Sequence, residues 1–169
     1  RKEIVYLTVN ELNNLEKTNF NDTRIQMVKE LFVFCCYTGL GFKEMSNLKK
    51  ENLSKEFDGE LWIVIKRIKT NRNYKVPLLP KAKVILDKYM PINEEFLFPR
   101  ISNPSFNSFL KIIANRIGIK KRLTHHIARK TFATTVLLYN NVPMEIVSKL
   151  LGHSKIQTTQ EHYGEIIQK

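Results

Sequence analysis

The chain has 169 residues, 43% of them hydrophobic and 10% aromatic, so its length and apolar content suit one compact domain with a full core. Lysine and arginine number 28 against 16 acidic residues, and the net charge of +12 favours a polyanionic partner, although a solvated basic surface has the same composition. The sequence contains neither an apolar run of about 18 residues nor the apolar core of a signal peptide, so we expect a cytoplasmic protein with no membrane partner.

The N-terminal part of the chain is predicted to be helical. Thr8 and Glu11 form a T-x-x-E capping box, which indicates that a short helix begins there. Apolar residues at helical spacing then predict a buried helix over residues 25–39, which ends at a glycine. Cys35 and Cys36 are adjacent within it and match neither a usual disulfide nor a zinc site, so we interpret them as core thiols.

The middle of the chain contains the only pattern typical of strands. Residues 61–65 are apolar, residues 70–73 form a polar break, and residues 74–78 can return as a second strand, which predicts a β-hairpin. Pro80 stands where the next helix can start, and a further helix is expected to close at Gly118.

The C-terminal part is predicted to hold three helices. A long helix over residues 124–139 begins at a threonine that can cap it, and Pro143 opens another helix that stops at Gly152. Residues 154–157 read S-x-x-Q, a capping box for a last helix that carries Tyr163. The fold class is therefore mainly α, with one small antiparallel β-hairpin or sheet.

Two short stretches contain residues suited to phosphate chemistry. His126, Arg129 and Lys130 are three and four residues apart, so a helix presents them on one face. Arginine grips phosphate oxygens with two hydrogen bonds, and histidine can donate to a developing charge. This H-x-x-R pattern alone is better explained by a surface that binds ions, but a second histidine, His153, lies before the helix of Tyr163.

Taken together and in chain order, these stretches resemble the motifs of tyrosine recombinases and phage-type integrases. The similar stretches are residues 6–8 (Tyr-Leu-Thr), 37–48 (Tyr-Thr-Gly-Leu and the Glu that follows), 76–78 (Val-Pro-Leu), 124–134 (Thr-x-His-x-x-Arg-x-Thr-Phe-Ala-Thr) and 150–160 (Leu-Leu-Gly-His-Ser-x-Ile-x-Thr-Thr-Gln). The resemblance covers nearly the whole chain and implies that residues 1–169 are the catalytic domain, of the DNA breaking-rejoining fold. It implies that the N-terminal core-binding domain of such enzymes is absent from this chain.

The resemblance also implies an activity and a set of site residues. Tyr163 is expected to attack a DNA phosphate and form a 3′-phosphotyrosyl link, while Arg129, His126 and His153 stabilise the transition state. Lys69, in the hairpin, is expected to protonate the leaving 5′ oxygen. The link conserves the phosphodiester energy, so no cofactor, metal or ATP is implied.

The sequence departs from the family pattern in two places. Gly41 follows Thr-Gly-Leu where the family has its first arginine, so one phosphate-binding side chain is missing. Arg67 shares a face of the hairpin with Lys69 if the strand stays extended, and we nominate it as the replacement; Lys43 is the rival. The spacing from the Thr-Thr-Gln stretch to Tyr163 is also one residue longer than in many relatives.

Other cations are expected to contact the DNA backbone. They flank the expected site on the hairpin, beside Gly41 and around the H-x-x-R stretch: Lys43, Lys66, Arg72, Lys75, Lys120, Lys121, Arg122 and Lys130. The expected partners are double-stranded DNA and other recombinase protomers, in a tetramer on paired sites. This domain alone is expected to bind DNA weakly and to be mainly monomeric.

Two other functions stay open at this stage. A type IB topoisomerase would relax supercoils through the same phosphotyrosine link. A weak or noncatalytic DNA-binding module would accommodate Gly41 easily, but it would not need His126, Arg129, His153 and Tyr163 together.

Overall fold

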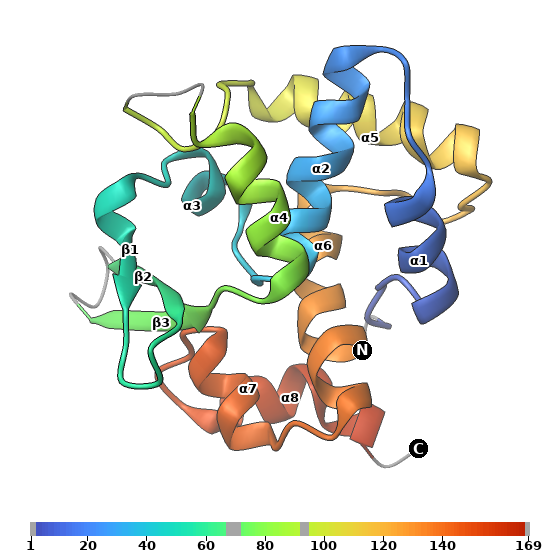
Figure 1. The fold of residues 1–169 in the computed structure, drawn as a ribbon. Coiled ribbons are helices and arrows are strands. Elements are labelled where there is room, and N and C mark those ends of the chain that lie inside the picture. The colour runs from blue at the N-terminus through green and yellow to red at the C-terminus, as the bar shows by residue number, and fades with distance from the viewer. Residues whose placement is uncertain (1–2, 67–71, 92–94, 168–169) are drawn as a thin grey trace.

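The computed structural model describes residues 3–66, 72–91 and 95–167, and it is mainly helical with one small sheet (Figure 1). The helices are α1 (Val9–Lys17), α2 (Thr23–Cys36), α3 (Phe42–Ser46), α4 (Pro80–Tyr89), α5 (Asn103–Ile117), α6 (His125–Thr131), α7 (Met144–Leu150) and α8 (Ile156–Ile167). The strands are β1 (Leu53–Lys55), β2 (Leu61–Lys66) and β3 (Asn73–Pro77), preceded by a 3₁₀ turn, η1 (Lys50–Asn52). Among the described residues, no helix is both long and apolar enough to cross a bilayer.

The local signals for helix ends in the first part of the chain are confirmed. Thr8 and Glu11 form both hydrogen bonds of a capping box at the start of α1. Pro80 occupies the first turn of α4, where a missing N–H costs nothing. Helix α5 ends at Gly118, whose φ of 84° is the left-handed conformation that glycine adopts without strain.

The sheet contains the predicted hairpin and one further strand. Strands β2 and β3 pair antiparallel, with Ile63 opposite Val76 in the buried register. Strand β1 pairs with the other edge of β2 through only three residues. Three residues are too few to show the alternation of apolar and polar side chains that reveals a strand in a sequence.

The predicted long helix over residues 124–139 is only partly α-helical. Helix α6 ends at Thr131 and continues as a π-helix, η2 (Phe132–Leu137), and a 3₁₀ turn, η3 (Leu138–Asn140). The hydroxyl of Thr134 donates to the carbonyl of Lys130 at 2.7 Å. Such threonine bonds to the preceding turn compete with the regular ladder, which accounts for the change of winding that the apolar pattern did not reveal.

The N-terminal segment is fastened to this same helix. Leu7 is fully buried, and its N–H donates to the hydroxyl of Thr131 at 3.0 Å. The hydroxyl of Thr135 donates to the carbonyl of Leu7. Nearby, the ammonium of Lys121 donates to the carbonyl of Tyr6 at 2.8 Å. Residues far apart in the sequence thus hold the segment before α1 against α6 and η2.

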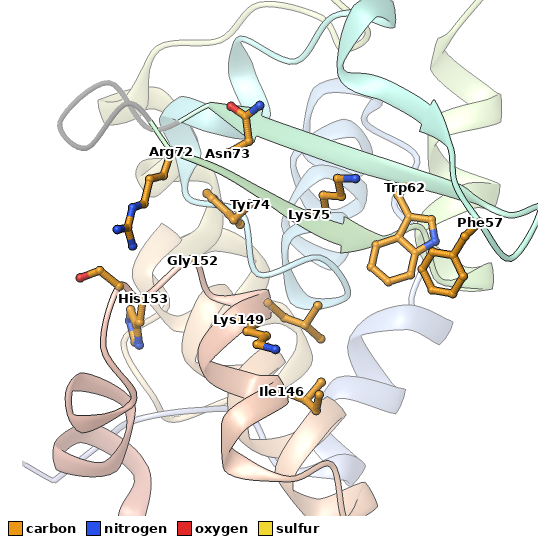
Figure 2. Close-up of a pocket in the computed structure, with 12 residues that line it drawn as sticks. Phe57, Trp62, Arg72, Asn73, Tyr74, Lys75, Ile146, Lys149, Gly152 and His153 are labelled. Atoms are coloured by element: carbon orange, nitrogen blue, oxygen red, sulfur yellow. The ribbon is translucent and has the colours of Figure 1, made fainter.

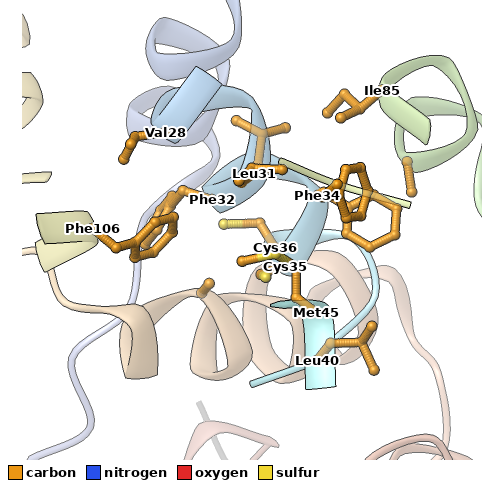
Figure 3. Close-up of a cluster of buried hydrophobic side chains, with 14 of the residues drawn as sticks. Val28, Leu31, Phe32, Phe34, Cys35, Cys36, Leu40, Met45, Ile85 and Phe106 are labelled. Carbon is orange, nitrogen blue, oxygen red and sulfur yellow. The ribbon is translucent and has the colours of Figure 1, made fainter. Parts of the chain in front are cut away.

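The hydrophobic interior consists of two clusters. The larger cluster, around α2, contains Phe32, Phe34 and Phe106 (Figure 3), and it includes the buried face of α6. Cys35 and Cys36 lie within it as free thiols, and burial raises the pKa of each, which confirms that they are core residues.

The smaller cluster joins η2 and η3, the end of β3, α7 and α8. Its buried members are Val76, Phe132, Ala133, Leu137, Leu138, Val147, Leu151 and Tyr163. Tyr74 and Val136 pack against both clusters and so lie at their boundary. Figure 1 shows α7 and α8 together below the sheet, apart from α2, α4 and α5.

The last two helices begin and end almost as the sequence indicates. Pro143 precedes α7, and Gly152, with a φ of 73°, follows it in the left-handed conformation. The predicted capping box at Ser154 is wrong in position, because α8 begins at Ile156 and the residue before it is Lys155. Within the described part of the chain, Ser154 and Gln157 share no hydrogen bond.

Candidate active site

Arg129 links the two turns that border the candidate site. One guanidinium nitrogen, Nη1, donates to the carbonyl of Gly39 at 2.8 Å, and Nη2 donates to the carbonyl of Leu151 at 2.6 Å. Gly39 has a φ of 74°, and a Cβ there would lie 2.4 Å from the ring of Phe132, so only glycine fits this turn. The half-buried guanidinium therefore has a fixed orientation before any ligand arrives.

Gly41 stands just before α3, and the side chain of Glu44 lies against it. The carboxylate of Glu44 folds back and accepts a hydrogen bond from the N–H of Gly41 at 3.2 Å. A Cβ on Gly41 would lie 2.8 Å from that carboxylate oxygen. Lys43, the rival replacement, is exposed on the same short helix.

His126 is exposed on α6 and stacks on a second imidazole. The rings of His125 and His126 have centroids 3.9 Å apart, and His125 also packs against Phe42. Within the described part of the chain, Nδ1 of His125 is buried without a hydrogen-bond partner. Burial, and then the neighbouring His126, lower the pKa of His125, which favours its neutral form.

His153 is held in the turn between α7 and α8. Its N–H donates to the carbonyl of Ser148 at 3.0 Å, and its ring nitrogen Nδ1 shares a 2.6 Å hydrogen bond with the hydroxyl of Thr159. A Cβ on Gly152 would lie 2.7 Å from the ring of Tyr74, so strand β3 packs directly against this turn. The position of His153 thus depends on α8 and on the sheet.

Tyr163 lies inside the smaller cluster, with 5% of its surface exposed. Burial raises the pKa of its phenol, while the positive charge of Arg129 acts in the opposite direction. The side chains of Arg129 and Tyr163 are therefore close enough to interact electrostatically. The ring of Tyr163 is therefore almost completely covered by the smaller cluster.

Two of the expected catalytic residues, Arg67 and Lys69, lie outside the described residues. The structure describes the residues on either side of them: Lys66 ends β2 and is exposed, and Arg72 is exposed just before β3. Figure 2 shows the side chain of Arg72 extending toward the turn that carries His153. Strand β3 thus begins close to the turn that carries His153.

The expected DNA-contacting cations differ in what they already bind. Lys75 pairs with Glu56, and Lys121 pairs with Glu11 at 2.6 Å. The exposed members are Lys43, Lys66, Arg72, Lys75, Lys120 and Arg122, and the half-buried ones are Lys121 and Lys130.

Among the described residues, no three histidine, cysteine or acidic side chains gather as a metal centre.

Several residues that shape the site were not singled out from the sequence. Thr159, which orients His153, lies inside the Thr-Thr-Gln stretch and was read only as part of that motif. The carbonyls of Gly39 and Leu151 bind Arg129 through backbone atoms, for which side-chain patterns give no signal. In the sequence, Tyr74 is one aromatic residue of a strand. Its contact with the turn at Gly152 is visible only in the folded chain.

Comparison with known proteins gives a consistent result. The model described as the phage integrase family matches residues 6–167. A tyrosine recombinase of Pseudothermotoga lettingae is 29% identical over 171 residues, covering 97% of this chain and 57% of that protein. Tyrosine recombinase XerD of Listeria monocytogenes is 28% identical over 171 residues, covering 91% of this chain and 56% of the relative. The chain thus spans little more than half the length of these relatives.

Solved structures share the fold over nearly the whole chain. The XerA recombinase superposes with a TM-score of 0.76 and 25% identity, over 96% of this chain and 61% of that one. The catalytic domain of bacteriophage HP1 integrase gives a TM-score of 0.70 at 22% identity, over 97% of this chain and 89% of that one. The likeness to the HP1 domain concerns the fold alone.

Proposed function

Because the chain belongs to the phage integrase family, we propose that it is the domain of a site-specific tyrosine recombinase that cuts and rejoins DNA. The observation that carries the proposal is the arrangement around Arg129. Its guanidinium binds both the Gly39 turn and the turn of His153, and its charge acts on Tyr163. The proposal is supported by a guanidinium that reaches from one element toward an imidazole and a phenol on two others.

The proposed reaction is an exchange of oxygen atoms on phosphorus. The phenol oxygen of Tyr163 forms a bond to the scissile phosphate as its proton leaves, and the bond to the 5′ oxygen breaks. A 3′-phosphotyrosyl link and a free 5′-hydroxyl result. Attack of a 5′-hydroxyl from a partner strand on that link reverses the exchange, frees the phenol and joins the new strand.

The other side chains act on charge. Arg129 and the imidazoles of His126 and His153 stabilise the negative charge on the non-bridging oxygens of the five-coordinate phosphorus. Lys69 delivers the proton that the 5′ oxygen needs as it leaves. The hydrogen bond to Thr159 supports the role of His153, since it fixes the plane of the ring.

Arg67 is proposed to replace the missing first arginine. A guanidinium can reproduce a two-pronged grip on phosphate, which the ammonium of Lys43 cannot. The absence of a side chain at Gly41 is the observation that favours the alternative, a domain that binds DNA and cleaves it poorly. Cleavage rates of Arg67→Ala and Lys43→Ala separate these possibilities, because wild-type rates in both remove both candidates.

The proposed partners are double-stranded DNA and other protomers. Two proteins of the same fold, the XerH recombinase and the Tn1549 transposon integrase, have been solved with a difH substrate and with circular-intermediate DNA, respectively. We expect this domain alone to be mainly monomeric and the full recombinase to act as a tetramer at cytoplasmic, nucleoid DNA. Size exclusion with light scattering tests the first point, and a stable tetramer without DNA contradicts it.

The decisive experiment is a search for the covalent intermediate. Nicked or half-site DNA, which traps the cut strand, is incubated with the protein, and any adduct is digested and mapped by mass spectrometry. We expect the modified peptide to contain Tyr163, and Tyr163→Phe to give none. DNA binding without any adduct supports the binding module, whereas relaxation of supercoils without strand exchange supports a topoisomerase.

A further inference from the structure

A hollow of about 630 Å³ lies between the sheet and α7, with His153 at one end (Figure 2). The volume lies within the range of about 300–1,000 Å³ that small-molecule sites occupy. Its walls come from the turn between β1 and β2, from β2 and β3, and from α7 with the turn that follows it. The roles proposed above use only the His153 end, so the remainder has no assigned occupant.

One end of the hollow is aromatic and open to solvent. Phe57 is 94% exposed, with its ring centroid 6.3 Å from that of Trp62. The indole N–H of Trp62 donates to the two carboxylate oxygens of Asp58 at 3.1 and 3.2 Å, which fixes the ring. Tyr74 adds a third ring along the same wall. Flat, fixed aromatic faces are the usual platform on which unpaired nucleobases stack.

The hollow is also positively charged. Among the described residues that line it there is no aspartate or glutamate, whereas Arg72, Lys75 and Lys149 contribute cations. Lys75 is neutralised by Glu56, but no ion pair within the described ranges involves Arg72 or Lys149, and both are exposed. Arg72 lies at the His153 end, and Figure 2 shows Lys149 on the helix side. An anionic occupant is therefore favoured.

We propose that this hollow binds an unpaired nucleotide of a DNA strand, with the base against the aromatic wall and the adjoining phosphates at Arg72 and Lys149. The source of that strand rests on the proposed function, since cleavage beside His153 frees a single strand next to the hollow. Held there, the nucleotide keeps the cut strand near the reaction centre until it is rejoined. Binding of an unpaired base is independent of catalysis and can be measured separately.

An acidic peptide, including a segment of a second copy of this chain, is the other occupant to consider. The charge would suit it, but the walls favour a nucleotide. Three of the lining side chains are flat aromatic rings, on which a nucleobase can stack. Removal of the base separates the two occupants, because an abasic strand, like an acidic peptide, offers charge without a base to stack.

Trp62 is the only tryptophan in the chain, so its fluorescence reports on the hollow directly. The protein is titrated with a single-stranded tetranucleotide and, separately, with an abasic oligomer of the same length and charge. We expect the tetranucleotide to quench Trp62 and the abasic oligomer to bind about tenfold more weakly or worse, because stacking is lost. Equal binding and quenching by both oligomers overturns the proposal.

Charge variants locate the phosphates. Arg72→Ala combined with Lys149→Ala should weaken tetranucleotide binding about tenfold or more and lower the salt slope by about 1.4, or about 0.7 per lost contact. The matched control is Lys111→Ala on α5, which removes one exposed cation far from the hollow and should change neither quantity appreciably. An equal loss in control and test variants means a diffuse basic surface and refutes the site.

The test separates this proposal from the proposed function. Wild-type protein that forms the Tyr163 adduct with half-site DNA, but whose Trp62 the tetranucleotide does not quench, retains the function and refutes the nucleotide site. Quenching by the tetranucleotide without any Tyr163 adduct supports the nucleotide site and refutes the proposed function. Quenching that rises with protein concentration alone, without oligonucleotide, identifies a second copy as the occupant and also refutes the proposal.

Discussion

The two hydrophobic clusters differ in size and in the chemistry that they support. Helix α6, with His126 and Arg129, rests on the larger cluster through the buried residues Ile127 and Ala128. His153 and Tyr163 depend on the smaller one, formed by η2, η3, α7, α8 and the end of β3. Elements with few buried apolar contacts open at lower free energy than the main core. The guanidinium of Arg129 is therefore on an element held by the larger cluster, and the phenol of Tyr163 is on elements held by the smaller one, which should open at lower free energy.

This comparison predicts that the deepest substitution in the larger cluster has the largest effect. Phe32 is fully buried in α2, so Phe32→Ala should lower the free energy of unfolding by about 3–5 kcal/mol. Denaturant titration followed by circular dichroism measures it. The loss should be global, with hydrogen exchange accelerating in α2 and α8 alike, and exchange that accelerates in α2 alone would show that the smaller cluster does not depend on the larger one.

A matched change in the smaller cluster should act more locally. Leu151 is fully buried, and Leu151→Ala should cost about 2–5 kcal/mol within this cluster. We expect amide exchange in α7 and α8 to accelerate while α2 keeps most of its protection. Equal acceleration in all three helices would show that the two clusters unfold together, and the proposed difference in mobility would be wrong.

The contact between the sheet and the His153 turn can be isolated with two glycines. Gly152→Ala places a Cβ 2.7 Å from the ring of Tyr74 at a φ of 73°, whereas Gly59→Ala meets no atom at a φ of 79°. The left-handed backbone costs about 1–2 kcal/mol in both, so the difference reports the contact. Gly152→Ala should be the less stable and should shift the His153 resonances in NMR spectra, and equal stability with unmoved resonances would dismiss the contact.

The smallest expected effect concerns the titration of Tyr163. Its folded pKa is raised by burial, so its contribution to stability is complete below its ordinary pKa of about 10 and is lost as pH rises through the folded value. The slope from one such group is at most about 1.4 kcal/mol per pH unit. Tyr163→Phe should therefore lose less stability than the wild type above pH 10. Identical pH profiles from urea titrations would indicate that the phenol is not buried in solution.

Local signals accounted for most of the fold because they act over a few residues. The capping box at Thr8, the proline at residue 80 and the glycine at residue 118 each favour one backbone conformation wherever they occur. The change of winding after Thr131 was missed because it depends on threonine hydroxyls that compete with the backbone, and the apolar pattern is the same in either winding. Strand β1 was missed because it exists only through its pairing with β2.

The part of the candidate site that consists of side chains in sequence motifs was predictable. His126, Arg129, His153 and Tyr163 were expected from their motifs, and the structure brings Arg129 near Tyr163 and to the backbone of the turn that holds His153. The grip of Arg129 on two carbonyls and the packing of Tyr74 on Gly152 join residues remote in sequence. Neither contact has a periodicity or a spacing, so only the folded chain reveals it.

The hydrogen bonds of Leu7 have a mechanical consequence. Both backbone groups of this residue are bound by Thr131 and Thr135, which flank the end of the helix that bears Arg129. A force on the backbone before Tyr6 would stretch these two hydrogen bonds before it could separate α1 from α2. The segment that precedes α1 is thus coupled, through two threonine hydroxyls, to the helix end that follows Arg129.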